Sequence, residues 1–341
     1  MLKSYLQLLM SKVHLTKDES ENAMNIIIDD ADSHQIAAFL AILKYREVTS
    51  SEVIGMATAL QKKALPVKFS FPTLDIVGTG GDLANTVNIS TGSAILAAAC
   101  GIPIAKHGNR SVSSRSGSAD VLEELEIDID AAPEDLMHYI QETGIAFMFA
   151  PKYHPSLKKI AVIRKGLKIP TVFNFLGPLL NPAKVEYVLI GVANESSLEL
   201  MAQSVLELGH TKRALVFHGN GLDELTTLGK SVAYQIQDGQ MNLLEIDPKS
   251  FGFASCVLKD LQGGDACLNA SILKDVFAGR KGAIADTLIL NAGAAVWIFG
   301  RTPSLEEGIE VARKVLQEGG ALKVLEKSIE ISRKIKSLRA A

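Results

Sequence analysis

The spacing of hydrophobic and polar positions divides the chain into two regions. Residues 1–64 carry helical periodicity and no alternating strand pattern. Three polar pairs there have the spacing of helix N-caps or capping boxes: Thr16 with Glu19, Asp32 with Gln35, and Thr49 with Glu52. The pattern predicts a small helical bundle. The proline-flanked stretch Leu65–Pro72 then predicts an extended crossing between two domains.

Short apolar runs alternate with helical segments from Leu74 onward. Strands are predicted at 74–77, 102–105, 145–149, 187–192 and 214–217. Helices are predicted at 93–100, 119–125, 134–143, 197–208, 270–278, 283–299 and 305–317. Two alternating runs around Asp238–Gly239 predict a β-hairpin over 232–246. Such alternation is typical of a mostly parallel sheet covered by helices on both faces.

The fold expected from these patterns is α/β. It has a small N-terminal all-α domain, residues 1–68, which helical residues around 155–180 are expected to complete. A large α/β domain, residues 73–341, holds a central, mostly parallel sheet flanked by helices.

Composition and charge narrow the function classes. The 341 residues are 47% hydrophobic and 21% charged, with a formal net charge of −3, which argues against a protein that coats polyanions and against a disordered acidic tail. Three widely spaced cysteines without a CxxC pair indicate a reducing compartment. No apolar run reaches the roughly 20 residues that span a bilayer. We therefore expect a cytoplasmic protein that binds neither membranes nor nucleic acid; the basic stretch Lys327–Arg339 is expected to be a solvated helix face.

A glycine-rich loop follows the first predicted strand. Within Asp75–Asp82, three of the four consecutive residues 78–81 are glycine, and glycine lets backbone N–H groups approach an anion closely. The hydroxylic segment Thr86–Thr91 and a helix N-terminus come next, where phosphate groups are favoured. The loop is either a tight turn or a phosphate site; its place after a strand favours the phosphate site. Its pattern matches neither the dinucleotide-binding nor the P-loop motif.

Three further segments carry polar chemistry. Residues 105–118 combine cationic and hydroxylic side chains with little apolar mass, which suits a pyrophosphate site or a solvated loop. Asp223 and Glu224 lie in a glycine-containing loop after a strand, either as a site for a hard cation or as an exposed acidic turn. Arg164 could clamp a carboxylate or form a surface ion pair, and His154 could face a ligand or serve as a structural hydrogen bonder.

Taken together and in this order, the motifs resemble those of the anthranilate phosphoribosyltransferase family, within the nucleoside phosphorylase-like phosphoribosyltransferases. The matching stretches are DIVGTGGD, NIST, AKHGNRSVSS, SGSADVLE, FAPKYHP, FNFLGPLLNPA and GLDE. The resemblance runs from about Leu74 to the C-terminal helices, and the helical N-terminus fits it too. Three positions depart from the family pattern: Leu83 replaces a common glycine, Arg115 a lysine and Pro170 a frequent arginine.

The resemblance implies an enzyme that transfers the phosphoribosyl group of phosphoribosyl pyrophosphate (PRPP) to the amine of anthranilate in tryptophan biosynthesis. It also implies one or two Mg²⁺ ions and a homodimer formed through the N-terminal helical domain. We expect an oxocarbenium-like displacement at ribose C1 without a covalent nucleophile.

The resemblance also assigns residues. It places PRPP at Gly78, Gly81, Asp82, Thr86, Asn88, Ile89, Ser90, Thr91, Lys106, His107, Gly108, Asn109, Arg110, Ser111, Val112, Ser113, Ser114 and Ser118. It places anthranilate at Gly78, Asn109, Arg164, His107, His154 and Pro178. It implies Mg²⁺ at Ser90, Asp223 and Glu224, with Lys106, Asp223 and Glu224 as the catalytic groups.

Two other functions are compatible with such a fold. A non-catalytic relative that binds nucleic acid would be expected to lose Arg164, Asn109 and the acidic pair and to gain basic surface. A pyrimidine nucleoside phosphorylase would be expected to carry a KHSGR-like segment, whereas this chain has KHGNR at residues 106–110.

Overall fold

The structure is a computed structural model that describes residues 1–111 and 115–340. Four helices open the chain: α1 (Leu2–Met10), α2 (Lys17–Asp29), α3 (Ser33–Arg46) and α4 (Ser50–Lys63). The predicted capping boxes of Thr16 with Glu19 and of Thr49 with Glu52 both form. Asp32 caps α3 differently from a capping box, because its side chain accepts from the His34 N–H.

A single seven-stranded sheet follows, with the strand order β3-β2-β1-β4-β5-β6-β7. The strands are β1 (Leu74–Gly78), β2 (Ile104–Gly108), β3 (Ile145–Phe149), β4 (Tyr187–Gly191), β5 (Arg213–His218), β6 (Ser231–Gln237) and β7 (Gln240–Ile246). The first five are parallel, and β6 and β7 form the antiparallel hairpin predicted around Asp238–Gly239. Both turn residues have positive φ, as a two-residue hairpin loop with a type I′ turn requires. The predicted α/β class is confirmed.

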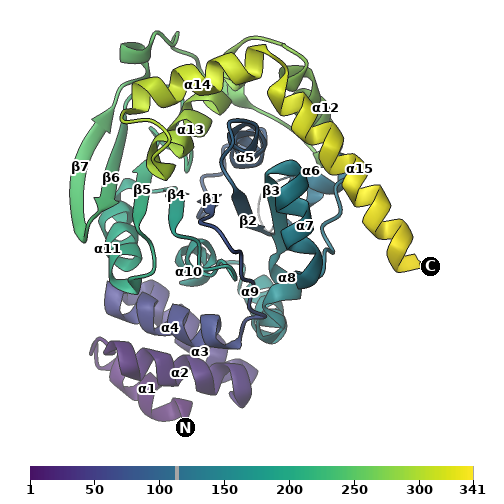
Figure 1. Cartoon of the computed structure of the whole chain (residues 1–341). Coiled ribbons are helices and arrows are strands. Elements are labelled where there is room, and N and C mark those ends of the chain that lie inside the picture. Colours follow the sequence, from purple (N-terminus) through teal and green to yellow (C-terminus); the bar gives the residue numbers. More distant parts are fainter. Residues whose placement is uncertain (112–114, 341) are drawn as a thin grey trace.

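Helices cover both faces of the sheet (Figure 1). On one face, α5 (Ile89–Ala99) and α13 (Ala283–Phe299) contact the strands. Helices α12 (Ala266–Phe277), α14 (Leu305–Gln317) and α15 (Gly320–Ala340) belong to the same hydrophobic core and pack on other helices. The other face packs against α7 (Pro133–Thr143), α10 (Phe173–Leu179) and α11 (Leu198–Leu208). The remaining helices are α6 (Ser118–Glu124), α8 (Ala150–Tyr153), α9 (Lys158–Leu167) and the short 3₁₀ turns Pro155–Leu157, Glu195–Ser197, Pro248–Phe251 and Leu258–Leu261.

The N-terminal helices lie below the sheet and contact the central segment of the chain (Figure 1). Helix α3 packs on α9, and α4 packs on α10 and α11. The Gln61 side chain donates to the Leu179 carbonyl at 2.7 Å, and the Leu65 N–H donates to the Tyr153 carbonyl at 2.8 Å. The apolar core therefore continues from the helical bundle to one face of the sheet.

Two predicted boundaries near the glycine loop are wrong. Strand β2 extends to Gly108 instead of ending at 105, and α5 begins at Ile89 instead of 93. Hydropathy missed the end of β2 because Lys106 and His107 are polar, yet both side chains are buried in the sheet. It missed the first turn of α5 because Ser90 and Thr91 are polar, whereas fully buried Ile89 anchors that turn to the core.

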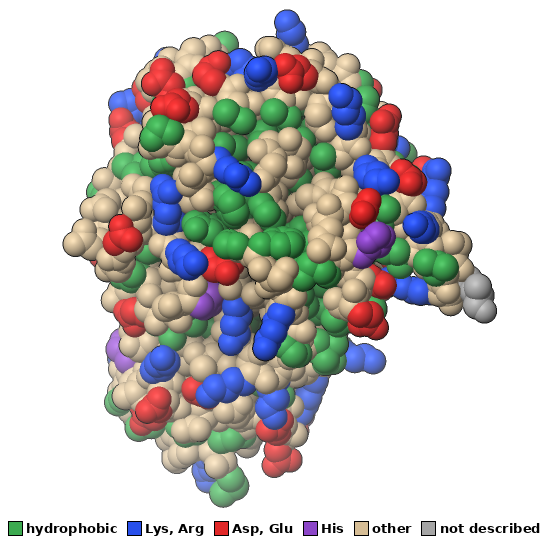
Figure 2. All heavy atoms as spheres, viewed as in Figure 1, with side chains coloured by type: hydrophobic (Ala, Val, Ile, Leu, Met, Phe, Trp, Pro, Cys, Tyr) green, Lys and Arg blue, Asp and Glu red, His purple; other side chains and the backbone are tan. Residues whose placement is uncertain are grey.

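The outer surface shows basic and acidic side chains intermixed over the face seen in Figure 2. Basic residues of α15 that were expected to be solvated partly form ion pairs: Arg333 pairs with Glu126, and Arg339 pairs with Asp128 and Asp135. Within residues 1–111 and 115–340, no helix is long and apolar enough to cross a membrane.

Candidate active site

The strand order reverses between β1 and β4, which is where open parallel sheets bind ligands. Residues Gly78 and Gly191 end these two strands and are register partners. The loop after β5 carries Asp223 and Glu224 and lies against the same edge. The glycine loop and the acidic loop, more than 140 residues apart in sequence, therefore meet at the switch point.

Glycines make this meeting possible. A Cβ added to Gly78 would stand 2.1 Å from Asp223 Oδ2, and one added to Gly191 would stand 1.6 Å from the Asp223 carbonyl oxygen. At Gly219 the same atom would lie 1.7 Å from the Glu224 carbonyl oxygen. At Gly191 and Gly219 the opposing atoms belong to the main chain, so β4 and the residue after β5 must present glycine to the acidic loop. At Gly78 the opposing atom is a side-chain oxygen, so a Cβ there would displace the Asp223 carboxylate.

The acidic loop is fixed by hydrogen bonds on both sides. The Gly80 N–H donates to Asp223 Oδ2 at 2.7 Å. His218 Nδ1 pairs with the Val192 carbonyl at 2.8 Å, so the Gly221 N–H donates to the other ring nitrogen at 3.0 Å. From α13, the buried Asn291 side chain donates to the Leu225 carbonyl and accepts from the Leu225 N–H. The loop that carries the two carboxylates is thus held before any ligand arrives.

Three carboxylates gather here, because Asp82 joins the acidic pair. One ligand atom from each of Asp82, Asp223 and Glu224 lies within 4.8 Å of the others. Burial raises the pKa of Asp223 to about 7, and the nearby Asp82 carboxylate adds to the rise. Burial and the adjacent Asp223 raise the pKa of Glu224 well above its ordinary value. Glu224 Oε2 is buried without a hydrogen-bond partner among the described residues. Clustered oxygen ligands with raised pKa values suit a hard divalent cation.

Lys106 lies beneath this cluster. Its side chain is only 2% exposed, and its ammonium donates to the Ile76 carbonyl on β1 at 2.5 Å. Burial lowers the pKa of Lys106, while the charges of Asp75 and Glu224 oppose that effect. The residue therefore comes close to the acidic pair from the interior, away from the open surface.

The segment from Thr86 to Thr91 bridges two parts of the site. Thr86 forms an isolated antiparallel bridge with Gln262. Asn88 precedes α5 and donates to the Ser116 carbonyl at 3.1 Å, while its Oδ1 accepts from Asn269 Nδ2 at 2.8 Å. The side chains of Ile89 and Thr91 point into the core, so that turn can offer a ligand only its backbone and the half-buried Ser90.

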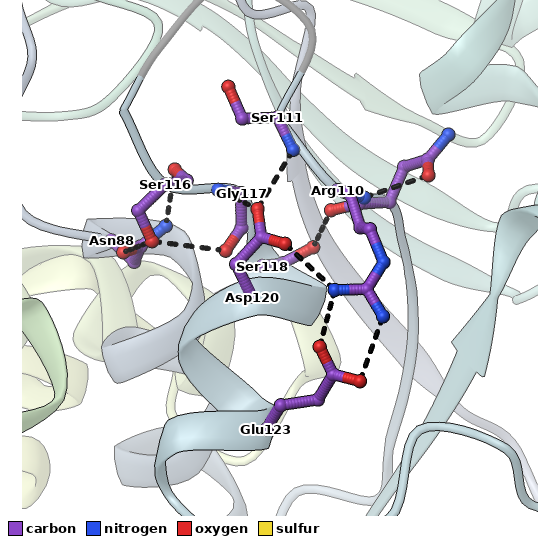
Figure 3. A network of polar contacts seen from close by, with 9 residues as sticks. Asn88, Arg110, Ser111, Ser116, Gly117, Ser118, Asp120 and Glu123 are labelled. Carbon is purple, nitrogen blue, oxygen red and sulfur yellow. Dashed lines mark hydrogen bonds and ion pairs between the residues drawn. The ribbon is translucent and has the colours of Figure 1, made fainter. Parts of the chain in front are cut away.

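The segment after β2 is drawn closely in Figure 3. Asn109 follows the strand, and its carbonyl accepts from the Ser118 hydroxyl at 3.1 Å. The Arg110 guanidinium pairs with Asp120 and Glu123 of α6 and lies 5.5 Å from the Phe149 ring centre. The expected PRPP residues Val112, Ser113 and Ser114 lie outside the described residues.

The residues expected to contact anthranilate form two groups. His107 and His154 are buried with ring centres 5.2 Å apart, and His154 Nε2 pairs with the Leu180 carbonyl just beyond Pro178. Burial, His154 and Lys106 lower the pKa of His107 to about 3, so its ring is neutral. Arg164 forms no ion pair with any described residue and lies over the Phe173 ring at 5.1 Å. No described hydrogen bond joins Arg164 to Asn109.

Several polar residues have roles in the site that were not predicted from the sequence. Asp82 was expected to contact PRPP but not to join the metal ligands. His218, Asn291, Asn181 and Asp120 each fix main chain or a charged group of the site. Asn181, for example, donates to Asp75 Oδ2 and to the Ala105 carbonyl, joining β1 to β2. A buried asparagine inside an apolar helix, such as Asn291, is the one sequence signal that could have been followed.

A mostly parallel sheet whose strand ends carry a glycine loop and a partly buried carboxylate cluster, with a helical bundle beside it, is the arrangement expected of a two-part glycosyl transferase. Comparison with known proteins agrees with that class. The α/β domain of a glycosyl transferase family matches residues 70–322, and the helical bundle domain of that family matches residues 3–64.

Curated relatives share this architecture over their whole length. Anthranilate phosphoribosyltransferase of Chlamydia felis is 64% identical over 100% of this chain and 99% of its own. The Listeria innocua enzyme of that name is 41% identical over 97% of this chain and 99% of its own. The chain belongs to the anthranilate phosphoribosyltransferase family of glycosyl transferases.

Solved structures also match this chain over nearly its whole length. The anthranilate phosphoribosyltransferase of Thermus thermophilus superposes with a TM-score of 0.91 at 37% identity, over 96% of this chain and 99% of that one. The Saccharomyces cerevisiae enzyme, solved in complex with PRPP and Mg, gives a TM-score of 0.88 at 27% identity over 98% of each chain.

Proposed function

We propose that this protein transfers the 5-phosphoribosyl group from PRPP to the amine of anthranilate, giving N-(5-phosphoribosyl)anthranilate and pyrophosphate for tryptophan biosynthesis. The observation that carries the proposal is the meeting of the Gly78–Asp82 loop with Asp223 and Glu224 at the switch point of the sheet. A diphosphate held on backbone N–H groups there would lie beside a carboxylate cluster suited to Mg²⁺.

Charge that develops on the leaving pyrophosphate has to be stabilised. Asp82, Asp223 and Glu224 would hold one or two Mg²⁺ ions with Ser90, and such ions neutralise phosphate charge in the transition state. The Gly78, Gly81 and Thr86 backbone would bind the phosphates. Lys106 would act from beneath by its charge, since its ammonium is bound to the Ile76 carbonyl.

The acceptor needs orientation more than activation, because an aromatic amine is already neutral at pH 7. Arg164 carries a charge with no carboxylate partner among the described residues, and it would bind the anthranilate carboxylate. The rest of the acceptor site would be formed by Gly78, neutral His107, Asn109, His154 and Pro178. Holding the amine against ribose C1 then supplies the rate by proximity, through an oxocarbenium-like displacement without a covalent nucleophile.

The domain arrangement fits closure over the substrates. We take residues 1–68, with helical residues around 155–180, as the small domain and residues 73–341 as the large one. Arg164 lies on α9 in the first and the carboxylate cluster in the second, so their approach would exclude water from the ribosyl centre. We further propose a homodimer through the N-terminal helices, where Met10, Val13 and Tyr45 are exposed.

The activity is tested by the loss of anthranilate fluorescence when PRPP and Mg²⁺ are added to the purified chain. Wild-type protein should consume anthranilate and release pyrophosphate in equal amounts. The double variant Asp223→Asn, Glu224→Gln should lose turnover and its magnesium dependence. Absence of turnover in wild type, or cleavage of a pyrimidine nucleoside by phosphate in its place, would refute the proposal.

A further inference from the structure

The two ends of the segment between β2 and α6 lie against each other. A Cβ added to Gly117 would stand 2.3 Å from the Ser111 nitrogen and 2.7 Å from the Asn109 carbonyl oxygen. The Ala119 N–H also donates to that carbonyl, at 3.2 Å. Residues 109–111 and 117–119 therefore form a closed base for the segment, and glycine at 117 is required by this close approach.

Asp120 is the centre of this base. Its Oδ2 accepts from the Ser111 N–H at 3.0 Å and from the Gly117 N–H at 2.8 Å, one from each end of the segment (Figure 3). Its Oδ1 accepts from the Arg110 guanidinium at 3.0 Å. Burial disfavours the charge of Asp120, but the two amides and Arg110 outweigh burial and lower its pKa. One carboxylate thus ties both ends of the segment to α6.

The Arg110 side chain lies against α6 and Phe149. Its NH2 donates to Glu123 Oε1 at 2.8 Å, and its NH1 donates to the other oxygen of Glu123 and to Asp120. The guanidinium also lies against the Phe149 ring, 5.5 Å from its centre. To reach a phosphate, the side chain would have to leave two carboxylates and an aromatic ring.

The base is also joined to the neighbouring segment before α5. The Asn88 side chain donates to the Ser116 carbonyl at 3.1 Å and accepts from the Ser116 hydroxyl at 3.2 Å. Asn88 in turn accepts from Asn269 on α12. Ser116 therefore links the base to the first turn of α5, which is the other expected phosphate-binding segment.

We propose that Asp120 and Glu123 are positioning residues for PRPP: they hold Arg110 and the base, residues 109–111 and 117–119, in the arrangement in which this part of the site binds the phosphates. In this arrangement Arg110 acts through the two carboxylates and not as a phosphate ligand. The inference rests on the proposed function for the identity of the ligand. It differs from the resemblance-based assignment, which gives Arg110 a direct contact.

The physical reason is pre-organisation. An exposed ion pair contributes little to stability by itself. Here, however, the arginine forms a bidentate pair with one carboxylate and also binds a second carboxylate that fixes two backbone amides. This arrangement removes conformational freedom that the chain would otherwise lose when a phosphate ligand binds. Its effect should therefore appear in PRPP affinity much more than in folding stability.

The test compares Arg110→Gln, Glu123→Gln and the double variant by calorimetric titration with PRPP and Mg²⁺. If Arg110 acts through Glu123, each single variant weakens PRPP binding by about fivefold to tenfold, and the double variant is no weaker than the worse single one. Asp120→Asn should weaken it at least as much, since asparagine has only one acceptor oxygen, and its NH2 group can accept from neither the backbone N–H groups nor the Arg110 guanidinium.

A direct phosphate contact by Arg110 predicts the opposite sign for one variant. Glu123→Gln would then free the guanidinium and leave PRPP affinity unchanged or higher, while Arg110→Gln lowers it. That pair of results overturns the inference. Glu245→Gln, which breaks the exposed ion pair between Glu245 on β7 and Lys230 just before β6, is the matched control and should change neither affinity nor Tm.

Steady-state kinetics separate positioning from general damage to the fold. In Glu123→Gln the KM for PRPP should rise, while the KM for anthranilate and kcat stay within about twofold of wild type. Equal rises of both KM values, or a fall in Tm of many degrees, overturn the positioning role. Failure of the proposed function is distinguishable, because wild type itself would then show no turnover.

Discussion

The main chain of Asp223 occupies the place of a side chain at Gly191: a Cβ built there would lie 1.6 Å from the Asp223 carbonyl oxygen. No rearrangement of a flexible side chain can relieve this overlap, because the opposing atom belongs to the backbone. The position of the acidic loop, and with it the expected metal site, thus depends on the glycine that ends β4.

The first prediction follows from that contact. Gly191→Ala should displace the Asp223–Glu224 loop and weaken Mg²⁺-dependent turnover by at least tenfold, with a loss of stability of about 1–3 kcal/mol typical of overpacking. Gly166→Ala on α9 is the control, because a Cβ there meets no atom within 4 Å. Turnover and urea unfolding measure the two effects. Full Mg²⁺-dependent activity in Gly191→Ala would contradict the prediction.

The second prediction concerns pH and metal. The pKa of Asp223 is raised to about 7 in the folded chain, whereas an unfolded Asp titrates near about 3.9. Between these values the folded state binds more protons, so the stability of metal-free protein should fall as pH rises through that window.

Mg²⁺ should reverse this loss, since it takes the place of the protons. The rise in Tm on adding Mg²⁺ should therefore be larger at pH 8 than at pH 6. Asp223→Asn should reduce both the pH-dependent fall and the difference in the Mg²⁺ effect. Thermal scans at several pH values check it, and a Mg²⁺ effect independent of pH would count against the raised pKa.

The third prediction concerns Leu83, where the family resemblance led us to expect a glycine. Leu83 has a φ of 61°, a left-handed backbone conformation that is strained for a residue with a Cβ. Its side chain is 77% exposed and therefore makes few contacts that could offset this strain. Leu83→Gly should relieve about 1–2 kcal/mol of strain and lose about 0.4–1 kcal/mol to the greater freedom of the unfolded chain. We expect a small net stabilisation in urea unfolding.

Leu83→Ala is the matched control, because alanine keeps the Cβ and should leave stability near that of the wild type. Equal stabilisation by Gly and Ala would show that the exposed leucine side chain, and not backbone strain, is the destabilising feature.

The fourth prediction concerns Arg164, whose pKa is lowered by burial and whose guanidinium has no carboxylate partner among the described residues. Arg164→Ala should raise the KM for anthranilate about tenfold to a hundredfold, the loss expected for a charge-assisted pair. The KM for PRPP and the Tm should change little. Lys165→Ala removes the next cation on α9 and should affect neither KM. A larger rise in the KM for PRPP would show that Arg164 faces the other substrate.

Local pattern was sufficient for much of the fold. The boundaries of β3, α13 and α14 were predicted to the residue, because each is a continuous apolar or strongly periodic run. The hairpin at Asp238–Gly239 and two capping boxes were predicted because a few neighbouring residues decide them. Polar residues that lie in the core, such as Lys106 and His107, were not predicted to belong to a buried strand, because their partners lie on other strands.

Periodicity and turn chemistry act over a few residues, so the fold class, the order of the elements and the motifs at the ends of the strands could be predicted from the residues alone. Three facts come from the three-dimensional arrangement: Asp82 joins Asp223 and Glu224, Arg110 pairs with Glu123, and Lys106 is buried. These facts depend on which strand ends become neighbours and on the low polarity of the space between them. Burial and the distances between charges, which set pKa values and ion pairs, do not exist until the sheet has formed.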